Sequence, residues 1–184
     1  MTGADASRVV YVVVCAAGPA GDVGRLVDLT QERGWTVQVI ATPSALAFID
    51  VPSLEAQTGR PVRSQYRSPG ESKTPPADAI VVAPATYNTI NKWANGISDT
   101  YALGVLAEAP GLGIPVVVLP FVNSALAGRA PFMNSVQALR SEGVQILLGP
   151  GQFEPHPPGS GSERNAVFPW RLAIAAVSAG ESSS

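Results

Sequence analysis

Short, unbroken runs of apolar and mostly β-branched residues recur along the chain, and helical stretches separate them. A strand that is apolar on both faces must be covered on both faces, which is typical of a parallel sheet between two layers of helices. The predicted strands are residues 9–15, 36–40, 80–83, 115–119 and 144–148. The alternation of strands and helices therefore predicts a doubly wound α/β fold, Rossmann-like or flavodoxin-like, with a parallel sheet and helices on both of its faces.

The segments between these strands divide into helices and two irregular connections. A helix should follow the loop at 16–21 and end near Gly34, because glycine is common just past a helix C-terminus. Thr42 suits the N-cap of the next helix. The other predicted helices are residues 87–95, 99–109, 131–142 and 168–178. Residues 52–78 and 149–165 are rich in proline and glycine, so we expect both to be irregular, with room for one short helix in the first.

The composition is that of a globular chain: 46% of the 184 residues are hydrophobic and 14% are charged. We expect a single domain over residues 1–178 and a disordered tail at 179–184. The net charge of −2 gives no reason to expect nucleic acid or a membrane surface as a partner. Cys15 is the single cysteine and cannot form an internal disulfide, which fits a cytoplasmic protein. The apolar run at 9–18 is too short to span a bilayer, and a buried first strand is favoured over a signal peptide.

Small and polar residues follow four of the predicted strands. Ligands of doubly wound folds bind at the carboxyl ends of the strands, so we expect these residues to share one pocket. The stretches are CAAG at 15–18, ATPS at 41–44, APAT at 83–86 and LPFVN at 119–123. The first of them begins a glycine-rich turn that can present backbone N–H groups to a phosphate, although a tight turn without a ligand is the alternative. Its spacing differs from the dinucleotide fingerprint and no acidic residue ends the second strand, so NAD is disfavoured.

The segment PATYNTINKWANGISDT, residues 84–100, carries more polar side chains than one helix start requires. Thr86 can serve as an N-cap, but Asn88, Thr89, Asn91 and Lys92 follow it within six residues. A polar helix start that faces a ligand explains this excess better than a solvated surface does, and a helix that is merely capped is the alternative.

This segment resembles the PASANT-type motif of the homo-oligomeric flavin-containing cysteine decarboxylases. That family includes the phosphopantothenoylcysteine decarboxylases and the lantibiotic peptidyl-cysteine decarboxylases, and the resemblance extends from the first strand to about Gly149. It implies non-covalently bound FMN and a trimer-based homo-oligomer. The FMN contacts that it implies are Gly18, Ser44, Ala85, Thr86, Asn88 and Thr89. Thr86 replaces the usual serine and keeps the hydroxyl, whereas Tyr87 replaces a small residue and is expected to narrow the pocket.

The family's substrate-binding motif, P-x-M-N-x-x-M-W, is altered in this chain. The motif should follow the fourth strand directly, where residues 120–127 read PFVNSALA, so Asn123 is its counterpart and the candidate catalytic residue. The resemblance implies that this asparagine meets the carboxylate or carbonyl of the substrate. The better match in letters, PFMN at 131–134, is interpreted as part of the next helix.

The family's catalytic histidine falls near Gly70, where this chain has none. The single histidine, His156, lies in the loop at 149–165 and is predicted to be solvated. Cys15 ends a buried strand and is interpreted as a small core residue rather than a nucleophile. No metal site is expected.

The resemblance therefore implies an FMN-binding flavoprotein that carries out a redox or decarboxylation reaction on a small or peptidyl thiol or carboxylate. A flavin prenyltransferase is disfavoured because CAAGPAG lacks the serine of their first loop. One alternative is a non-catalytic FMN-binding protein, a carrier or a regulatory subunit, which the missing histidine favours. Another is the same fold with a different phosphate ligand.

Overall fold

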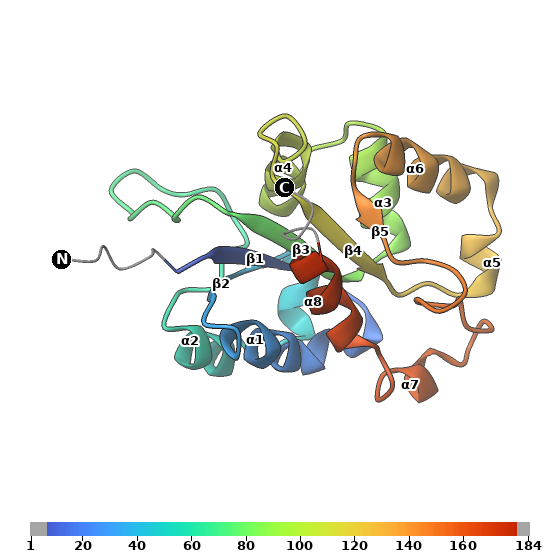
Figure 1. Ribbon diagram of the computed structural model, residues 1–184, viewed down its shortest axis with the longest axis horizontal. Helices are drawn as coiled ribbons and strands as arrows, with labels where there is room; N and C mark the ends of the chain where they lie inside the picture. The colour runs from blue at the N-terminus through green and yellow to red at the C-terminus, as the bar shows by residue number, and fades with distance from the viewer. Residues whose placement is uncertain (1–6, 180–184) are drawn as a thin grey trace.

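A computed structural model describes residues 7–179. Its centre is a sheet of five parallel strands in the order β2-β1-β3-β4-β5, which confirms the predicted fold class (Figure 1). The strands are β1 Val9–Val14, β2 Thr36–Ala41, β3 Ala79–Ala85, β4 Val116–Pro120 and β5 Gln145–Ile146. The order reverses between β1 and β3, and such a switch point is where open α/β sheets bind ligands.

Helices cover both faces of the sheet (Figure 1). One layer consists of α1 Gly24–Gln31, α2 Val51–Thr58 and α8 Trp170–Ala179. The other consists of α3 Tyr87–Ala94, α4 Tyr101–Glu108 and α6 Ala130–Ser141. Two single-turn helices, α5 Ser124–Ala127 and α7 Gly161–Arg164, and two 3-10 helices, η1 Gly18–Asp22 and η2 Pro43–Ala47, lie in the connections.

The core forms between these layers, as the unbroken apolar runs require. Every residue of β3 is buried, and so are five of the six residues of β1. Burying one valine or isoleucine side chain contributes about 1.5–3 kcal/mol, so these two central strands are a large part of the driving force for folding. On the helical side, Phe132 of α6 is fully buried and stacks on Tyr87 of α3, with ring centroids 5.4 Å apart.

Relative to its length, strand β5 shows the largest difference from the predicted strand boundaries. Strand β5 has two residues rather than the five predicted at 144–148. Residues 51–58 form α2, the short helix expected within the first irregular connection, and Asp50 caps it by accepting a hydrogen bond from the Ser53 N–H. Ala179 ends α8, and the remainder of the predicted tail lies outside the described residues.

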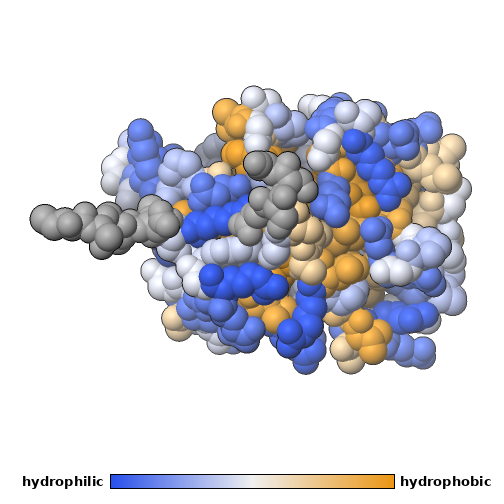
Figure 2. Space-filling view, in the orientation of Figure 1, coloured by the Kyte–Doolittle hydropathy of each residue, from blue (hydrophilic) through white to orange (hydrophobic). Residues whose placement is uncertain are grey.

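The face shown in Figure 2 has hydrophobic residues in its middle, where β4 and β5 lie, and a mixture of hydrophilic and hydrophobic residues around them. A two-residue edge strand offers few unpaired backbone groups, which limits edge-to-edge pairing with other chains. Within residues 7–179, no helix is long and apolar enough to cross a membrane.

Candidate functional site

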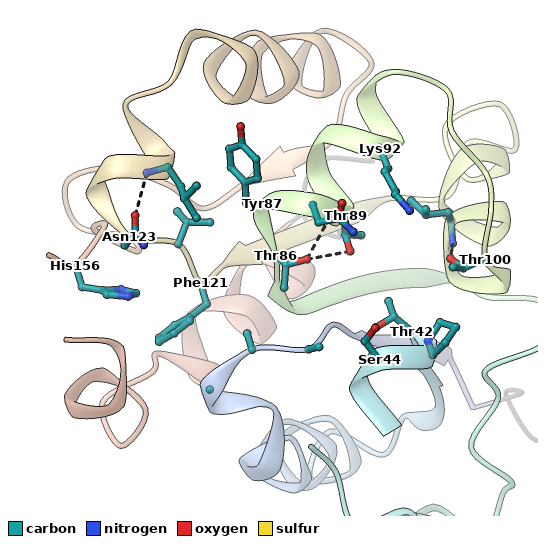
Figure 3. Close-up of a pocket in the computed structure, with 18 residues that line it drawn as sticks. Thr42, Ser44, Thr86, Tyr87, Thr89, Lys92, Thr100, Phe121, Asn123 and His156 are labelled. Carbon is teal, nitrogen blue, oxygen red and sulfur yellow. Dashed lines mark hydrogen bonds between the residues drawn. The ribbon is translucent and has the colours of Figure 1, made fainter. Parts of the chain in front are cut away.

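A cavity of about 670 Å³ lies at the carboxyl end of the sheet, where the loops after β1, β2, β3 and β4 converge (Figure 3). Each of these loops contributes to its wall, with Gly18, Ser44, Thr86 and Asn123 as respective examples. The loop at 149–165 contributes one residue, and α4 contributes Thr100 and Leu103 at its start. The four strand ends predicted to share a pocket therefore do so.

The turn after β1 packs against Asn165, a residue distant in the sequence, at Gly18. A Cβ atom on Gly18 would collide with the side-chain amide of Asn165, so a larger residue here would require that side chain to move. The buried Oδ1 of Asn165 has no hydrogen-bond partner within residues 7–179. Glycine at this position thus allows the Asn165 side chain to pack against the turn, whether or not a phosphate binds beside it.

The loop after β2 leaves its hydroxyl groups free. Thr42 occupies the N-cap position of η2 but makes no side-chain capping bond, which differs from its predicted role. Within residues 7–179, the hydroxyls of Thr42 and Ser44 have no hydrogen-bond partner, and both residues line the cavity. Two unpaired hydroxyl groups on one wall are available to a polar ligand.

The start of α3 combines a cap with a free amide. The Thr86 hydroxyl accepts a hydrogen bond from the Thr89 N–H, at 3.2 Å, and donates one to the Thr89 hydroxyl, at 3.0 Å. Asn88 is exposed and lines the cavity, and its side chain has no partner within residues 7–179. Thr86 therefore caps α3, whereas the side-chain amide of Asn88 is available to donate and accept hydrogen bonds in the cavity.

The later asparagines of this segment lie outside the cavity wall. Asn91 and Asn95 share a helix side with Asn88, but neither lines the cavity, because each helical turn moves about 5.4 Å away from the strand end. Asn95 instead donates to the Asn91 carbonyl oxygen. Ala85 is fully buried and lies outside the cavity wall, where its carbonyl accepts a hydrogen bond from the Phe121 N–H.

The cavity wall also includes a lysine, Lys92. Lys92 of α3 lines the cavity and pairs with Asp99. Tyr87 also lines it, as the resemblance implied, and its hydroxyl accepts a hydrogen bond from Arg129 at 3.1 Å. The wall is therefore polar, and the charge of Lys92 on it is balanced by Asp99.

Asn123 lies on the opposite side of the cavity, at the start of α5. Its side-chain oxygen caps this short helix by accepting the Leu126 N–H at 2.9 Å, which leaves the amide NH₂ group free to donate (Figure 3). The segment at 131–134 belongs to α6, and Met133 there is 60% exposed. The structure thus keeps Asn123 in the cavity wall and leaves PFMN outside it, as predicted.

The prediction that His156 is solvated was wrong. This residue is only 5% exposed and lines the cavity beside Asn123. Its ring lies 4.7 Å from that of Phe121 and 6.2 Å from that of Phe153, measured between centroids. The prolines and glycines of the loop suggested solvent, but Phe153, Phe168 and Phe121 form an aromatic cluster that holds the loop against β4. Phe153, three residues before the histidine, was the sequence signal for this anchor.

Cys15 is a core residue, as predicted, with 1% of its surface exposed. Burial raises the pKa of its thiol, and hydrogen bonds from Thr89 and Thr86 lower that pKa by less. The thiol is therefore held protonated and unreactive at neutral pH. Within residues 7–179, no cluster of three or more histidine, cysteine or carboxylate side chains is arranged to hold a metal ion.

These features define an α/β protein with a cofactor-sized pocket at the switch point of its sheet. Residues 3–162 match the family model described as Flavoprotein. The chain therefore belongs to the flavoprotein family, and the resemblance drawn from the sequence is confirmed.

Curated relatives share the same region. The coenzyme A biosynthesis bifunctional protein CoaBC of Escherichia coli (strain K12) is 30% identical over 132 residues, which are 68% of this chain and 32% of the relative. CoaBC of Vibrio vulnificus (strain YJ016) is 32% identical over 138 residues, which are 69% of this chain and 33% of the relative. The chain thus spans about a third of the length of these relatives.

Solved structures share the fold. The FMN-dependent cysteine decarboxylase SpaF superposes with a TM-score of 0.66 at 23% identity, covering 92% of this chain and 98% of its own. TvaF, the FMN-dependent cysteine decarboxylase from thioviridamide biosynthesis, gives 0.65 at 26% identity, covering 76% and 88%. The FMN-binding protein AtHal3 gives 0.67 at 20% identity, covering 90% and 96%. The family match and these FMN-binding neighbours support FMN as the cofactor.

Proposed function

We propose that this protein binds FMN in the cavity at the carboxyl end of its sheet and oxidises and decarboxylates a small or peptidyl substrate that carries a thiol and a carboxylate. One observation carries the proposal: four polar strand ends open into one cavity of about 670 Å³ in a chain of the flavoprotein family. Small-molecule cofactors occupy cavities of about 300–1,000 Å³, lined by apolar groups and a few placed polar ones.

The residues present fit FMN. The free hydroxyls of Thr42 and Ser44 and the free amide of Asn88 offer the hydrogen bonds that a phosphate and a polyol chain need. Leu103, on α4, adds an apolar surface of the kind an aromatic ring system contacts. Gly18, Thr86 and Thr89 border the same cavity, and the direct contact expected for Ala85 stays a prediction.

When bound, FMN supplies a two-electron acceptor, and the chain supplies binding and orientation. The free NH₂ group of Asn123 would donate to the carboxylate of the substrate. Phe121, Val122 and Leu126 also line the cavity and add apolar surface, and a charged hydrogen bond is stronger where such surface lowers the local dielectric constant. The geometry thus suits an anionic substrate bound on the side of the cavity opposite α3.

The FMN site is tested by absorbance and by two matched asparagine variants. We expect purified protein to show the visible bands of a flavin and to release FMN on heating. Asn88→Ala should weaken FMN binding up to about tenfold, since it removes one hydrogen bond worth about 0.5–1.5 kcal/mol. Asn95→Ala, on the same helix but outside the cavity, should bind FMN as the wild type does. A colourless protein that takes up no added FMN would refute the proposal.

A second candidate function is a non-catalytic FMN carrier or regulatory subunit. It is favoured by the absence of histidine from residues 52–78, where the family places its catalytic base, and none of the cavity-lining residues comes from that segment. Both candidates predict bound flavin. Anaerobic reduction of the flavin by a cysteine-containing acid, followed by release of carbon dioxide, separates them, because a carrier does neither.

We also propose a trimer-based homo-oligomer in the cytoplasm. The assembly rests on the family resemblance and on exposed apolar side chains, Phe48 after η2 and Ile97 after α3. Light scattering during gel filtration should report three chains, or a multiple of three, and a monomer at all concentrations would contradict this. Cell fractionation tests the location.

A further inference from the structure

Three titratable side chains line the cavity: Tyr87, Lys92 and His156. Two of them are engaged, since Lys92 pairs with Asp99 and the Tyr87 hydroxyl accepts a hydrogen bond from Arg129. His156 makes no side-chain hydrogen bond within residues 7–179. Among the cavity-lining groups, the imidazole is therefore the one available to exchange a proton near neutral pH.

The ring of His156 is buried, and its polar atoms have no hydrogen-bond partner within residues 7–179. The imidazole is 5% exposed, yet its Nδ1 atom is buried without a partner, which is costly unless the polar atom has a further role. Its Nε2 atom lies 3.3 Å from where a Cβ on Gly161 would sit, so a side chain at position 161 would crowd this edge of the ring. Neither nitrogen is committed to a partner in the chain, so the ring is free to adopt either tautomer.

His156 is also fixed beside the proposed substrate-binding asparagine. Asn123 and His156 form a parallel β-bridge, and the His156 carbonyl accepts a hydrogen bond from the Ser124 N–H at 2.8 Å. Figure 3 shows the imidazole extending from its loop between Asn123 and Phe121. The contact between the Phe121 and His156 rings restricts how the imidazole moves. A donor for a carboxylate and a base for a neighbouring group thus lie on adjacent backbone segments.

We infer that His156 is the acid–base residue of this site, accepting the thiol proton of a substrate whose carboxylate is held by Asn123. The inference rests on the proposed function, and it assigns to His156 the role of the histidine that is missing near Gly70. The ligand class is a thiol-bearing carboxylate, such as a C-terminal cysteine.

The protonation state of the ring suits a base. Burial is the main cause that lowers the pKa of His156, and the positive charge of Arg164 on α7 adds to it. Phe121 and Asn123, which follow β4, and Phe153 of the same loop contact His156 and carry no charge. The imidazole is therefore neutral at pH 7 and has a lone pair to accept a proton. Since only the neutral form is a base, the rate should rise with pH through the lowered pKa and level off above it.

The proton of the substrate thiol would move to the imidazole of His156 as the S–H bond breaks. Bound FMN would supply the two-electron acceptor for the hydride of the neighbouring C–H bond, so that a C=S double bond forms in the oxidised substrate. When the C–C bond to the carboxylate breaks and carbon dioxide leaves, its electron pair would form a C=C bond and the C=S electron pair would move onto sulfur. The imidazolium of His156 would then return its proton to that sulfur.

The first test uses the fact that the chain has one histidine. Ring signals in an NMR titration can therefore be assigned to His156, or removed with His156→Gln. The pKa should lie below 6.5 in the free protein. With FMN and N-acetylcysteine added, it should rise by about one unit or more, because a thiolate beside the ring favours the charged imidazolium. A ring whose signals do not respond to N-acetylcysteine overturns the inference.

The second test follows anaerobic flavin reduction by N-acetylcysteine over a pH series. His156→Gln should keep its FMN content and slow reduction by about 10²–10⁴-fold, with the rise at low pH lost. Glu154→Gln changes an exposed residue of the same loop and should behave as wild type. Retention of FMN and of the thermal unfolding midpoint by His156→Gln excludes a merely structural effect.

The outcomes separate the two proposals. Equal rates and equal pH profiles for wild type and His156→Gln overturn the role of His156 and leave the proposed function standing. Absence of FMN binding in the wild type overturns the proposed function. A ring that responds to N-acetylcysteine while the flavin stays oxidised supports the acid–base role and counts against thiol oxidation.

Discussion

Asn123→Asp is expected to lower kcat/KM for a cysteine-containing acid by about 10²–10³-fold while the protein stays folded and yellow. Aspartate keeps the oxygen that caps α5 through the Leu126 N–H, so the helix start is preserved. It removes the NH₂ donor and places a negative charge where the substrate carboxylate binds. Loss of one such donor in an enclosed site typically costs a rate factor of this size.

Two companion variants make this result specific to Asn123. Asn134→Ala alters the other asparagine that follows a P-F-x sequence, and because it is exposed on α6 it should leave kcat/KM unchanged. Asn123→Ala should lose both activity and about 0.5–2 kcal/mol of unfolding free energy, because it also removes the cap. Wild-type kinetics for Asn123→Asp would show that the carboxylate is held elsewhere.

Phe132→Ala should reduce the free energy of unfolding by about 3–5 kcal/mol. The ring is fully buried between α6 and α3, and its removal leaves a cavity that the rigid helices cannot close. Urea unfolding, followed by far-UV circular dichroism with FMN removed from all samples, measures the change. Tyr87 loses its stacking partner in this variant, so FMN affinity should fall as well.

The neighbouring residue provides the control. Met133 is 60% exposed on the same turn of α6, so Met133→Ala should change the unfolding free energy by no more than about 0.5 kcal/mol. A Phe132→Ala protein as stable as Met133→Ala would mean that the contact between α3 and α6 does not support the fold.

The sheet was predictable because its signal is local. Each strand is a short apolar run, and β1 and β3 lie where the sequence indicated to within two residues. The location of the cavity followed from topology, since parallel strands place their carboxyl ends together. The shorter β5 was not predictable from composition, because the apolar run at 144–148 is longer than the two residues that pair with β4.

The site was less predictable because its members are set by tertiary contacts. Asn88 and Asn91 look alike in the sequence, but the first lines the cavity and the second does not. His156 appeared solvated because its flanking residues favour loops, and its burial depends on Phe121 and Phe168, which are distant in the chain. Loop composition reports local backbone preference, and it says little about side-chain packing across the fold.

The loop at 149–165 is attached to the sheet by aromatic rings and single bridges rather than by a strand ladder. The residues that stabilise the sheet are therefore different from the residues of this loop, which include the proposed acid–base residue His156. Loops of this kind tolerate changes in length and sequence that a central strand does not. Replacing residues 149–165 can accordingly change the side chains available for catalysis in the cavity, while the loops after β1, β2 and β3 that are proposed to bind FMN stay the same.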